Sequence, residues 1–334
     1  MSERGRSGSE RRRWVGPLLA IAAALAFALS VPASKLLLRD TSQLAVAGLL
    51  YLGAGLALTG FRIVSRASRR RVNSRPRAAD TGVTVRGTSD WAWLAAATLS
   101  GAVAAPLLLL WGLRATPGAT ASLLISFEAV FTALWAAGLF KEHVVAQVWW
   151  AVLAVTAGGV LLGLEGGGSW GVSLGALAVV GGCALWGLDN NLTRNIVTFE
   201  PSRVAQLKGL AAGTVNLLLL LAVGGSLPRW PVVVFALIVG GLSYGVSLVL
   251  FVQALRYLGS TRTSAYFGAG PFFAAGISLV VDRSYPTLSL LAAAVLMLVG
   301  TALMISEQHV HEHAHDGVAH THWHVPDAEH RHGH

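Results

Sequence analysis

The chain has 334 residues, of which 54% are hydrophobic and only 12% are charged, and its formal net charge is +9. Soluble domains carry roughly 25% charged residues, so this composition excludes a water-soluble globular protein and favours one embedded in lipid. A mean hydropathy of +0.60 agrees with that class. The positive charge alone would suit nucleic acid binding, but the basic residues cluster between apolar segments.

The apolar residues form segments of about 20 residues, the length that crosses ~30 Å of hydrocarbon at ~1.5 Å per residue. A helix satisfies all its backbone polar groups internally, and these segments are too long and too uniformly apolar for barrel strands. In chain order the sequence predicts an all-α integral membrane protein of ten transmembrane helices: Trp14–Leu38, Gln43–Val64, Trp91–Leu113, Thr116–Phe140, Val144–Leu164, Gly171–Leu188, Val204–Val223, Pro231–Leu255, Thr261–Val281 and Thr287–Ile305.

The basic residues predict how the chain is oriented. Five arginines precede Trp14, and eight lie between Arg62 and Arg86. These clusters flank the first two predicted helices, so they face one side of the membrane, and positive residues mark the cytoplasmic side. We therefore expect a plasma (inner) membrane protein with both termini cytoplasmic. The arginine-rich loop, residues 65–90, lacks interleaved aromatics, so its expected partner is anionic lipid and not nucleic acid.

The two halves of the sequence repeat weakly with a shift of about 142 residues. Ser122 corresponds to Ser264, and Gly158 to Gly300. Each half holds five predicted helices, and an odd number inverts the second half relative to the first, as in alternating-access transporters. The predicted regions are a basic N-terminus (1–13), a first repeat (14–164), a linker (165–170), a second repeat (171–305) and a His-rich tail (306–334).

The first half carries a motif in its fourth and fifth predicted helices. An acid followed by aromatics (Glu128-Ala-Val-Phe131), a loop glutamate (Glu142), a helix-opening glutamine (Gln147) and a glycine pair (Gly158-Gly159) stand in this order. This pattern resembles the EamA repeat of the drug/metabolite transporter (DMT) superfamily. The resemblance covers residues 14–305 and implies two EamA-like repeats forming an exporter or exchanger of small organic metabolites.

The match to the EamA pattern has departures in both halves, and the loop-glutamine pattern of the first half is not repeated clearly after Asp282. The second half retains the proline and aromatics of the family's element as Pro271-Phe272-Phe273, but Gly270 replaces the acid. In the first half Ala129 replaces the proline.

Glu128 is the foremost candidate for a transport residue. It lies in the middle of the fourth predicted helix, where a carboxylate costs at least ~2.5 kcal/mol and should face a cavity or a partner. Such a group is a candidate proton carrier, although a hydrogen bond between helices would also explain it. Lys35, near the outer end of the first helix, either snorkels to the interface or attracts an anionic substrate.

Other polar or kink-forming residues at membrane depth line the cavity or form packing hydrogen bonds, and the sequence leaves both interpretations open. They are Asn216, Tyr244, Gln253, Tyr266 and Pro271. Asp189-Asn190-Asn191 follows the sixth predicted helix, and these residue types favour a helix cap or turn there. Lys208 is counted with the cytoplasmic loops.

Ten histidines alternate in the C-terminal tail, at positions 309, 311, 313, 315, 320, 322, 324, 330, 332 and 334. In an extended chain this spacing places His309, His311, His313 and His315 on one side, and likewise His320, His322 and His324, and His330, His332 and His334. Neutral imidazoles bind Zn²⁺, Ni²⁺ or Cu²⁺, so the tail is a candidate metal-binding segment, with a solvated tail as the alternative. No cofactor is required by the rest of the chain.

Two rival functions follow from the tail. One is a divalent metal-ion transporter, which the single acid recognised deep in the membrane disfavours. The other is a metal-responsive membrane sensor. An enzyme is not expected, since no paired catalytic acids or Ser/His set lies in the predicted helices. Without a nucleotide-binding motif, transport would draw on a proton or substrate gradient. The sequence leaves substrate, direction and oligomeric state open, with a homodimer as one option.

Overall fold

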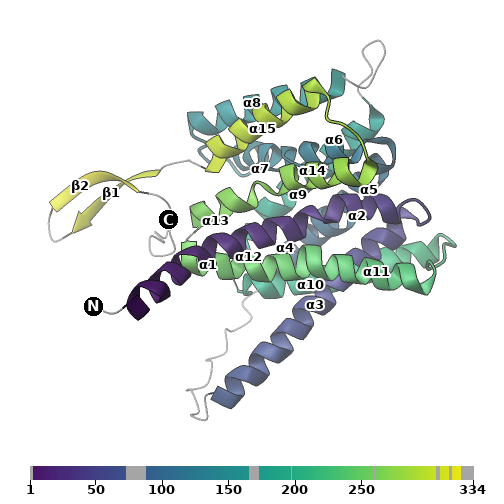
Figure 1. The fold of residues 1–334 in the computed structure, drawn as a ribbon, viewed down its shortest axis with the longest axis horizontal. Coiled ribbons are helices and arrows are strands. Elements are labelled where there is room, and N and C mark those ends of the chain that lie inside the picture. Colours follow the sequence, from purple (N-terminus) through teal and green to yellow (C-terminus); the bar gives the residue numbers. More distant parts are fainter. Residues whose placement is uncertain are drawn as a thin grey trace.

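The computed structural model describes residues 3–72, 88–164, 173–196, 198–258, 260–305, 309–315 and 318–324. As far as Ile305 the regular elements of the described chain are helices, which lie side by side in one bundle (Figure 1). The first half contains α1 (Glu3–Ala28), α2 (Ser30–Leu37), α3 (Gln43–Val72), α4 (Thr88–Ala97), η1 (Thr98–Ala104), α5 (Ala105–Ala115), α6 (Gly118–Leu124), α7 (Phe127–Gly138) and α8 (Ala146–Leu164).

The second half continues the bundle. Its elements are α9 (Leu174–Arg194), α10 (Pro201–Ala222), α11 (Trp230–Gly240), η2 (Gly241–Val246), α12 (Ser247–Leu258), α13 (Ser260–Phe267), α14 (Gly270–Asp282) and α15 (Leu288–Ile305). The elements η1 and η2 are short π-helical segments inside longer helices. In Figure 1, α1 begins and α15 ends at the same side of the bundle.

Seven helical stretches of the described chain are long and apolar enough to cross a membrane. They are Trp14–Leu37, Gln43–Ser65, Asp90–Ala115, Gly118–Gly138, Ala146–Gly163, Pro201–Ala222 and Trp230–Leu255. Gly270–Asp282 and Leu288–Met304 are shorter apolar helices, and α9 spans 21 residues. The protein is therefore a multi-pass membrane protein.

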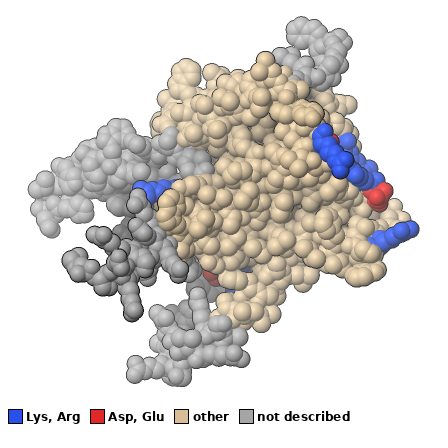
Figure 2. All heavy atoms as spheres, viewed as in Figure 1, with Lys and Arg blue, Asp and Glu red and all other residues tan. Residues whose placement is uncertain are grey.

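The outer surface of the bundle suits lipid. Large apolar side chains such as Leu288, Val280 and Trp230 are exposed over 84%, 77% and 74% of their surface. On the face in Figure 2, uncharged residues dominate and the coloured charges lie toward the two ends of the helical body. An exposed apolar area of this extent is stable only in contact with hydrocarbon.

One predicted helix end is wrong, because α9 extends to Arg194 beyond the predicted Leu188. Helix α1 also begins before its predicted membrane segment, at Glu3, and α3 continues after its own to Val72, but the candidate spans Trp14–Leu37 and Gln43–Ser65 agree with the two predicted segments. Charged residues made these segments look like loops, but arginine is a good helix former and a helix can continue past the hydrocarbon into water. The predicted linker and residues 73–87 lie outside the described residues.

Two helices are interrupted at corresponding points of the two halves. The fourth predicted helix breaks between Leu124 and Phe127, and the ninth breaks between Phe267 and Gly270. Pro271 therefore does not kink a continuous helix but occupies the first turn of α14, where its missing N–H costs nothing. The π segments η1 and η2 also lie at corresponding positions of the two halves. Each half therefore contains one helix with such an interruption and one helix that a π segment widens.

Small residues bring the helices of the two halves into close contact. A Cβ added to Gly213 of α10 would lie 2.6 Å from the backbone nitrogen of Leu52 in α3, and one added to Gly209 would lie 2.9 Å from that of Gly55. Gly209 and Gly213 therefore allow the backbones of α10 and α3 to pack closely. In lipid such packing, rather than the hydrophobic effect, drives helices together.

The tail contains two short antiparallel strands, β1 (His309–His315) and β2 (Val318–His324). Their register places His309 opposite His324, His311 opposite His322, and His313 opposite His320. The backbone of these two segments is therefore extended. His330, His332 and His334 lie outside the described residues.

Candidate functional site

A cavity of about 910 Å³ lies between the two halves of the bundle; we call it the main cavity. Glu128 and Thr132 of α7 form part of its wall, and Trp186 of α9, Tyr244 of η2 and Pro271 of α14 form other parts. A volume of this size accommodates a small organic molecule.

The main cavity reaches one end of the bundle and not the other. Its lining includes His143 and Arg194, which are exposed. Arg194 forms an ion pair there with Glu142, which also lines the cavity. Because exposed residues form part of the wall, the cavity opens at this end.

The opposite end is closed by contacts that cross between helices. The Nζ atom of Lys35 in α2 donates to the backbone oxygen of Thr116 at 2.6 Å. Arg114 donates from Nη2 to the backbone oxygen of Thr41 at 2.8 Å. Thr41 and Thr116 are both buried, so these contacts join tightly packed elements at this end.

A second cavity of about 470 Å³ adjoins the main one. Five aromatic side chains line both cavities, and we call them the aromatic wall: Phe27, Tyr51, Tyr244, Phe251 and Phe267.

The rings of the aromatic wall contact one another in sequence. Tyr51 and Tyr244 stack with centroids 5.6 Å apart, and Tyr244 meets Phe27 edge-on at 6.0 Å. Phe27 lies 5.5 Å from Phe267, which meets Phe251 at 4.9 Å. These distances fall in the range of favourable aromatic pairs. The rings thus form one continuous surface built from α1, α3, η2, α12 and α13.

Glu128 stands in the first turn of α7, directly after the interruption of the fourth predicted helix. Its Oε1 atom accepts a hydrogen bond from Asn190 Nδ2 at 2.9 Å, and Asn190 also donates to Thr132 at 3.1 Å. Cys183 holds the interruption itself, since its thiol contacts the backbone oxygens of Leu124 and Ile125 at 3.5 and 3.9 Å. The break in the helix therefore presents the Glu128 carboxylate to the cavity.

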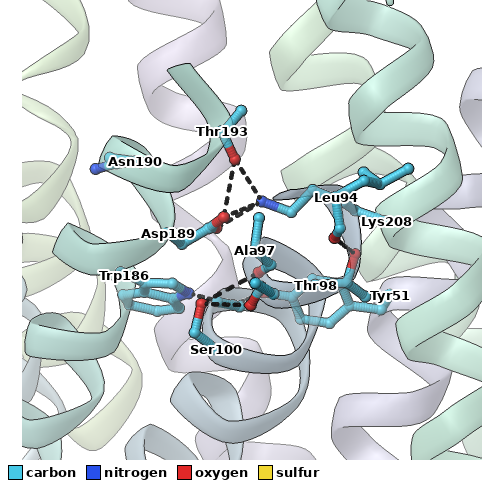
Figure 3. A network of polar contacts seen from close by, with 12 residues as sticks. Tyr51, Leu94, Ala97, Thr98, Ser100, Trp186, Asp189, Asn190, Thr193 and Lys208 are labelled. Atoms are coloured by element: carbon cyan, nitrogen blue, oxygen red, sulfur yellow. Dashed lines mark hydrogen bonds and ion pairs between the residues drawn. The ribbon is translucent and has the colours of Figure 1, made fainter. Parts of the chain in front are cut away.

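Asp189 and Lys208 form a buried ion pair beside the main cavity (Figure 3). Lys208 Nζ lies 2.5 and 2.6 Å from the two carboxylate oxygens of Asp189. Thr193 donates to the same carboxylate at 2.9 Å. The side chain of Lys208 is only 15% exposed and that of Asp189 only 11%. A charge at this depth requires a partner, and each of these residues supplies it for the other.

The π segment η1 is held by side chains from other helices. Trp186 Nε1 and the Tyr51 hydroxyl donate to the backbone oxygen of Gly101 at 2.8 and 3.1 Å. Asn216 donates to the backbone oxygen of Ala102 at 3.4 Å. π segments are frequent at functional sites because they offer backbone groups outside the regular ladder. Here the backbone oxygen of Gly101 in η1 fixes the side chains of Tyr51 and Trp186, two residues of the cavity wall (Figure 3).

The model of the EamA-like transporter family matches residues 14–164 and 173–306, one match in each half. The chain belongs to the EamA-like transporter family. It is a membrane transporter. The resemblance predicted from the sequence is thereby confirmed, with its two repeats.

A curated relative of this EamA-like transporter comes from Methanothermobacter thermautotrophicus and is named an uncharacterized transporter. The two are 26% identical over 307 residues, which cover 89% of this chain and 88% of the relative. A solved crystal structure matches with a TM-score of 0.59 and 18% identity, covering 88% of this chain and 99% of the other. At that identity the match shows that the fold is shared.

Only some of the predicted site residues of this EamA-like transporter line the same cavity. Glu128, Tyr244 and Pro271 line the main cavity. Lys35 does not line either cavity and instead contributes to the closed end. Three further candidates lie outside both cavity walls: Asn216, Gln253 and Tyr266. Asn216 is completely buried against η1 and serves packing there.

Three residues of the site are not predicted from the sequence. Asp189 and Asn190 have the residue types of a helix cap, but both lie within α9 and contact side chains of other helices. Lys208 was counted with a cytoplasmic loop, but it lies in the second turn of α10 and pairs with Asp189. Extending the sixth helix by two turns would have revealed an acid at membrane depth that needs a basic partner.

Proposed function

We propose that this EamA-like transporter carries a small organic metabolite across the plasma membrane by alternating access, as an exporter or exchanger. The main cavity supports this proposal most directly. It lies between the two halves, it opens at the end where Arg194 is exposed, and it is closed at the end where Lys35 contacts Thr116. This is the arrangement of one of the two states that alternating access requires.

The proposal includes ten membrane crossings in two inverted halves. A reciprocal contact between α8 and α15 supports it. A Cβ added to Gly158 would lie 3.0 Å from the backbone oxygen of Ala293, and one added to Gly300 would lie 2.9 Å from that of Ala151. The members of each pair differ by the shift of about 142 residues found in the sequence. Two equivalent elements that contact each other through equivalent residues are related by a two-fold axis.

The inverted halves give the transport cycle a physical basis. Exchanging the conformations of the two halves would open the end near Lys35 and close the end near Arg194. With positive residues inside, the open end of this structure faces the cytoplasm, and both termini lie on that side. The driving force in this proposal is a proton or substrate gradient, with Glu128 as the proton-carrying group.

Flux through reconstituted vesicles tests the proposed function. The purified chain is placed in lipid vesicles loaded with a panel of labelled metabolites, and efflux is compared with that from protein-free vesicles, with and without a pH gradient. Accelerated efflux of at least one metabolite is expected. If no metabolite moves faster than in protein-free vesicles, while untargeted metabolomics shows no difference between cells with and without the protein, the proposal fails.

We also propose that the tail binds Zn²⁺, Ni²⁺ or Cu²⁺. Three pairs of histidine positions stand opposite each other in the register of β1 and β2, and opposite positions have Cβ atoms ~5 Å apart. Titration of the full-length chain with each metal, compared with a chain ending at Ile305, tests this. Equal metal uptake by both chains would contradict it.

A further inference from the structure

We infer, building on the transport function proposed above, that the main cavity selects a monovalent organic cation with an apolar or aromatic body. The inference combines two features that face the same space. One is the Glu128 carboxylate, whose partner is a neutral amide. The other is the aromatic wall, a continuous surface of five rings.

The charges around the two cavities are balanced except at Glu128. Arg194 is paired with Glu142 at the mouth, and Lys208 is paired with Asp189. Among the residues that the structure describes, Glu128 forms no ion pair. A carboxylate at this depth is unfavourable without a counter-charge, and either a proton or a cationic substrate can supply one.

The aromatic wall favours the same charge. The face of an aromatic ring carries partial negative charge and attracts a cation within about 6 Å, by up to ~2 kcal/mol when water is excluded. Tyr51, Tyr244 and Phe251 present rings to the cavity, and rings also pack well against an apolar or aromatic body. The wall therefore stabilises both the charge and the body of an organic cation.

Other classes of ligand fit this cavity less well. An anion would meet the negative charge of Glu128, and the lysine and arginine described near it are already engaged by Asp189 and Glu142. A neutral solute would gain no ion pair from Glu128, which would then hold its proton. A divalent metal ion requires several oxygen or imidazole ligands, and the other carboxylates of the main cavity wall, Asp189 and Glu142, are held by Lys208 and Arg194.

A set of three probes of similar size separates these classes. Benzyltrimethylammonium is the cation, neopentylbenzene is its neutral counterpart, and benzylsulfonate is an anion. Binding of each to the full-length chain in lipid nanodiscs is measured by calorimetry or by competition. We expect the cation to bind at least tenfold more tightly than either of the other two.

Variants connect this preference to Glu128. In Glu128→Gln the affinity for the cation should fall at least tenfold, while that for the neutral probe should change little. Glu128→Asp keeps the charge and should retain most of the preference. Glu200→Gln is the matched control, because Glu200 is 70% exposed, pairs with Arg62 and lines neither cavity. Its cation affinity should equal that of the unaltered chain.

A second variant tests the aromatic wall. Phe251→Leu keeps an apolar side chain but removes the ring, so it should weaken binding of the cation several-fold more than binding of the neutral probe. Size-exclusion profiles and thermal unfolding establish that each variant is folded, and Glu128→Asp provides a second reading of the same position if Glu128→Gln does not fold.

Binding and flux distinguish this inference from the proposed function. Equal affinity for the three probes, or unchanged cation affinity in Glu128→Gln, overturns the cation preference even if vesicles show transport. Selective cation binding without accelerated flux supports the preference and overturns the transport proposal instead.

Discussion

The buried pair of Asp189 and Lys208 carries two charges at a depth where neither is stable alone. Asp189→Asn leaves the lysine without its counter-charge, and loss of one partner of such a pair costs about 3–5 kcal/mol. We therefore expect a clearly lower unfolding temperature for Asp189→Asn in detergent or nanodiscs.

The double variant Asp189→Asn/Lys208→Met is the control for this prediction. It removes both charges, so its unfolding temperature should recover most of the loss. A double variant as unstable as Asp189→Asn would show that the loss arises from packing of Asp189 and not from the unpaired lysine.

A substitution of Glu128 is the most direct test of the transport proposal. Glu128→Gln keeps the size of the side chain and its hydrogen-bonding capacity but fixes a neutral group. We expect the dependence of vesicle flux on a pH gradient to disappear, with expression and folding retained. The measurement is the initial rate of metabolite efflux at several external pH values. A pH dependence equal to that of the unaltered chain would remove Glu128 from proton coupling.

At the residue scale the sequence predicted the site in part. Glu128 was identified because an acid inside an apolar run is costly and demands a reason. Asp189 was missed because the predicted helix ended at Leu188, which moved it out of the membrane. Lys208 was missed because it was counted with the cytoplasmic loops, although it lies within the predicted helix Val204–Val223. Whether Asn216 and Gln253 face a cavity depends on helix rotation, which an almost uniformly apolar helix does not encode in its pattern.

At the scale of elements, η1 and α9 approach so closely that only glycine fits between them. A Cβ added to Gly101 would overlap the Asp189 carboxylate. We expect Gly101→Ala to destabilise the protein by about 1–3 kcal/mol, since overpacking forces side chains or backbone to move. The unfolding temperature of the purified variant measures this.

Gly60→Ala in α3 provides the comparison for Gly101→Ala. A Cβ added to Gly60 meets nothing within 4 Å, and alanine favours a helix over glycine by roughly 1 kcal/mol. This variant should be as stable as the unaltered chain or slightly more stable. Similar losses in both variants would refute the steric explanation.

The closed end depends on contacts made by α2 and α5. Lys35→Met removes the hydrogen bond to Thr116 and should favour opening at that end. Ser278 of α14 is only 1% exposed there. In a Cys183→Ser background, Ser278→Cys should react slowly with a membrane-impermeant maleimide, and adding Lys35→Met should accelerate the reaction. Tyr285→Cys, at a residue 93% exposed, should react quickly in both backgrounds.

At the scale of the whole molecule, the proposed orientation rests on the distribution of charge and on the proposed even number of crossings. A fluorescent protein fused after residue 334 should fluoresce in intact cells, because it folds in the cytoplasm. Alkaline phosphatase fused near Tyr285, an exposed residue between α14 and α15, should be active outside. Phosphatase activity at the C-terminus would contradict both the orientation and the inverted duplication.

The sequence by itself determined the class of the protein, the approximate position of its helices, its EamA family and the presence of a repeat. These properties depend on composition and on the period of apolar and charged residues, which a linear chain records directly. Only the tertiary structure decided that Asp189 meets Lys208, that Asn190 meets Glu128, and that five rings from separate helices form one wall. Such contacts depend on how helices rotate and cross, and in lipid these are set by the detailed fit of small residues rather than by a hydrophobic pattern.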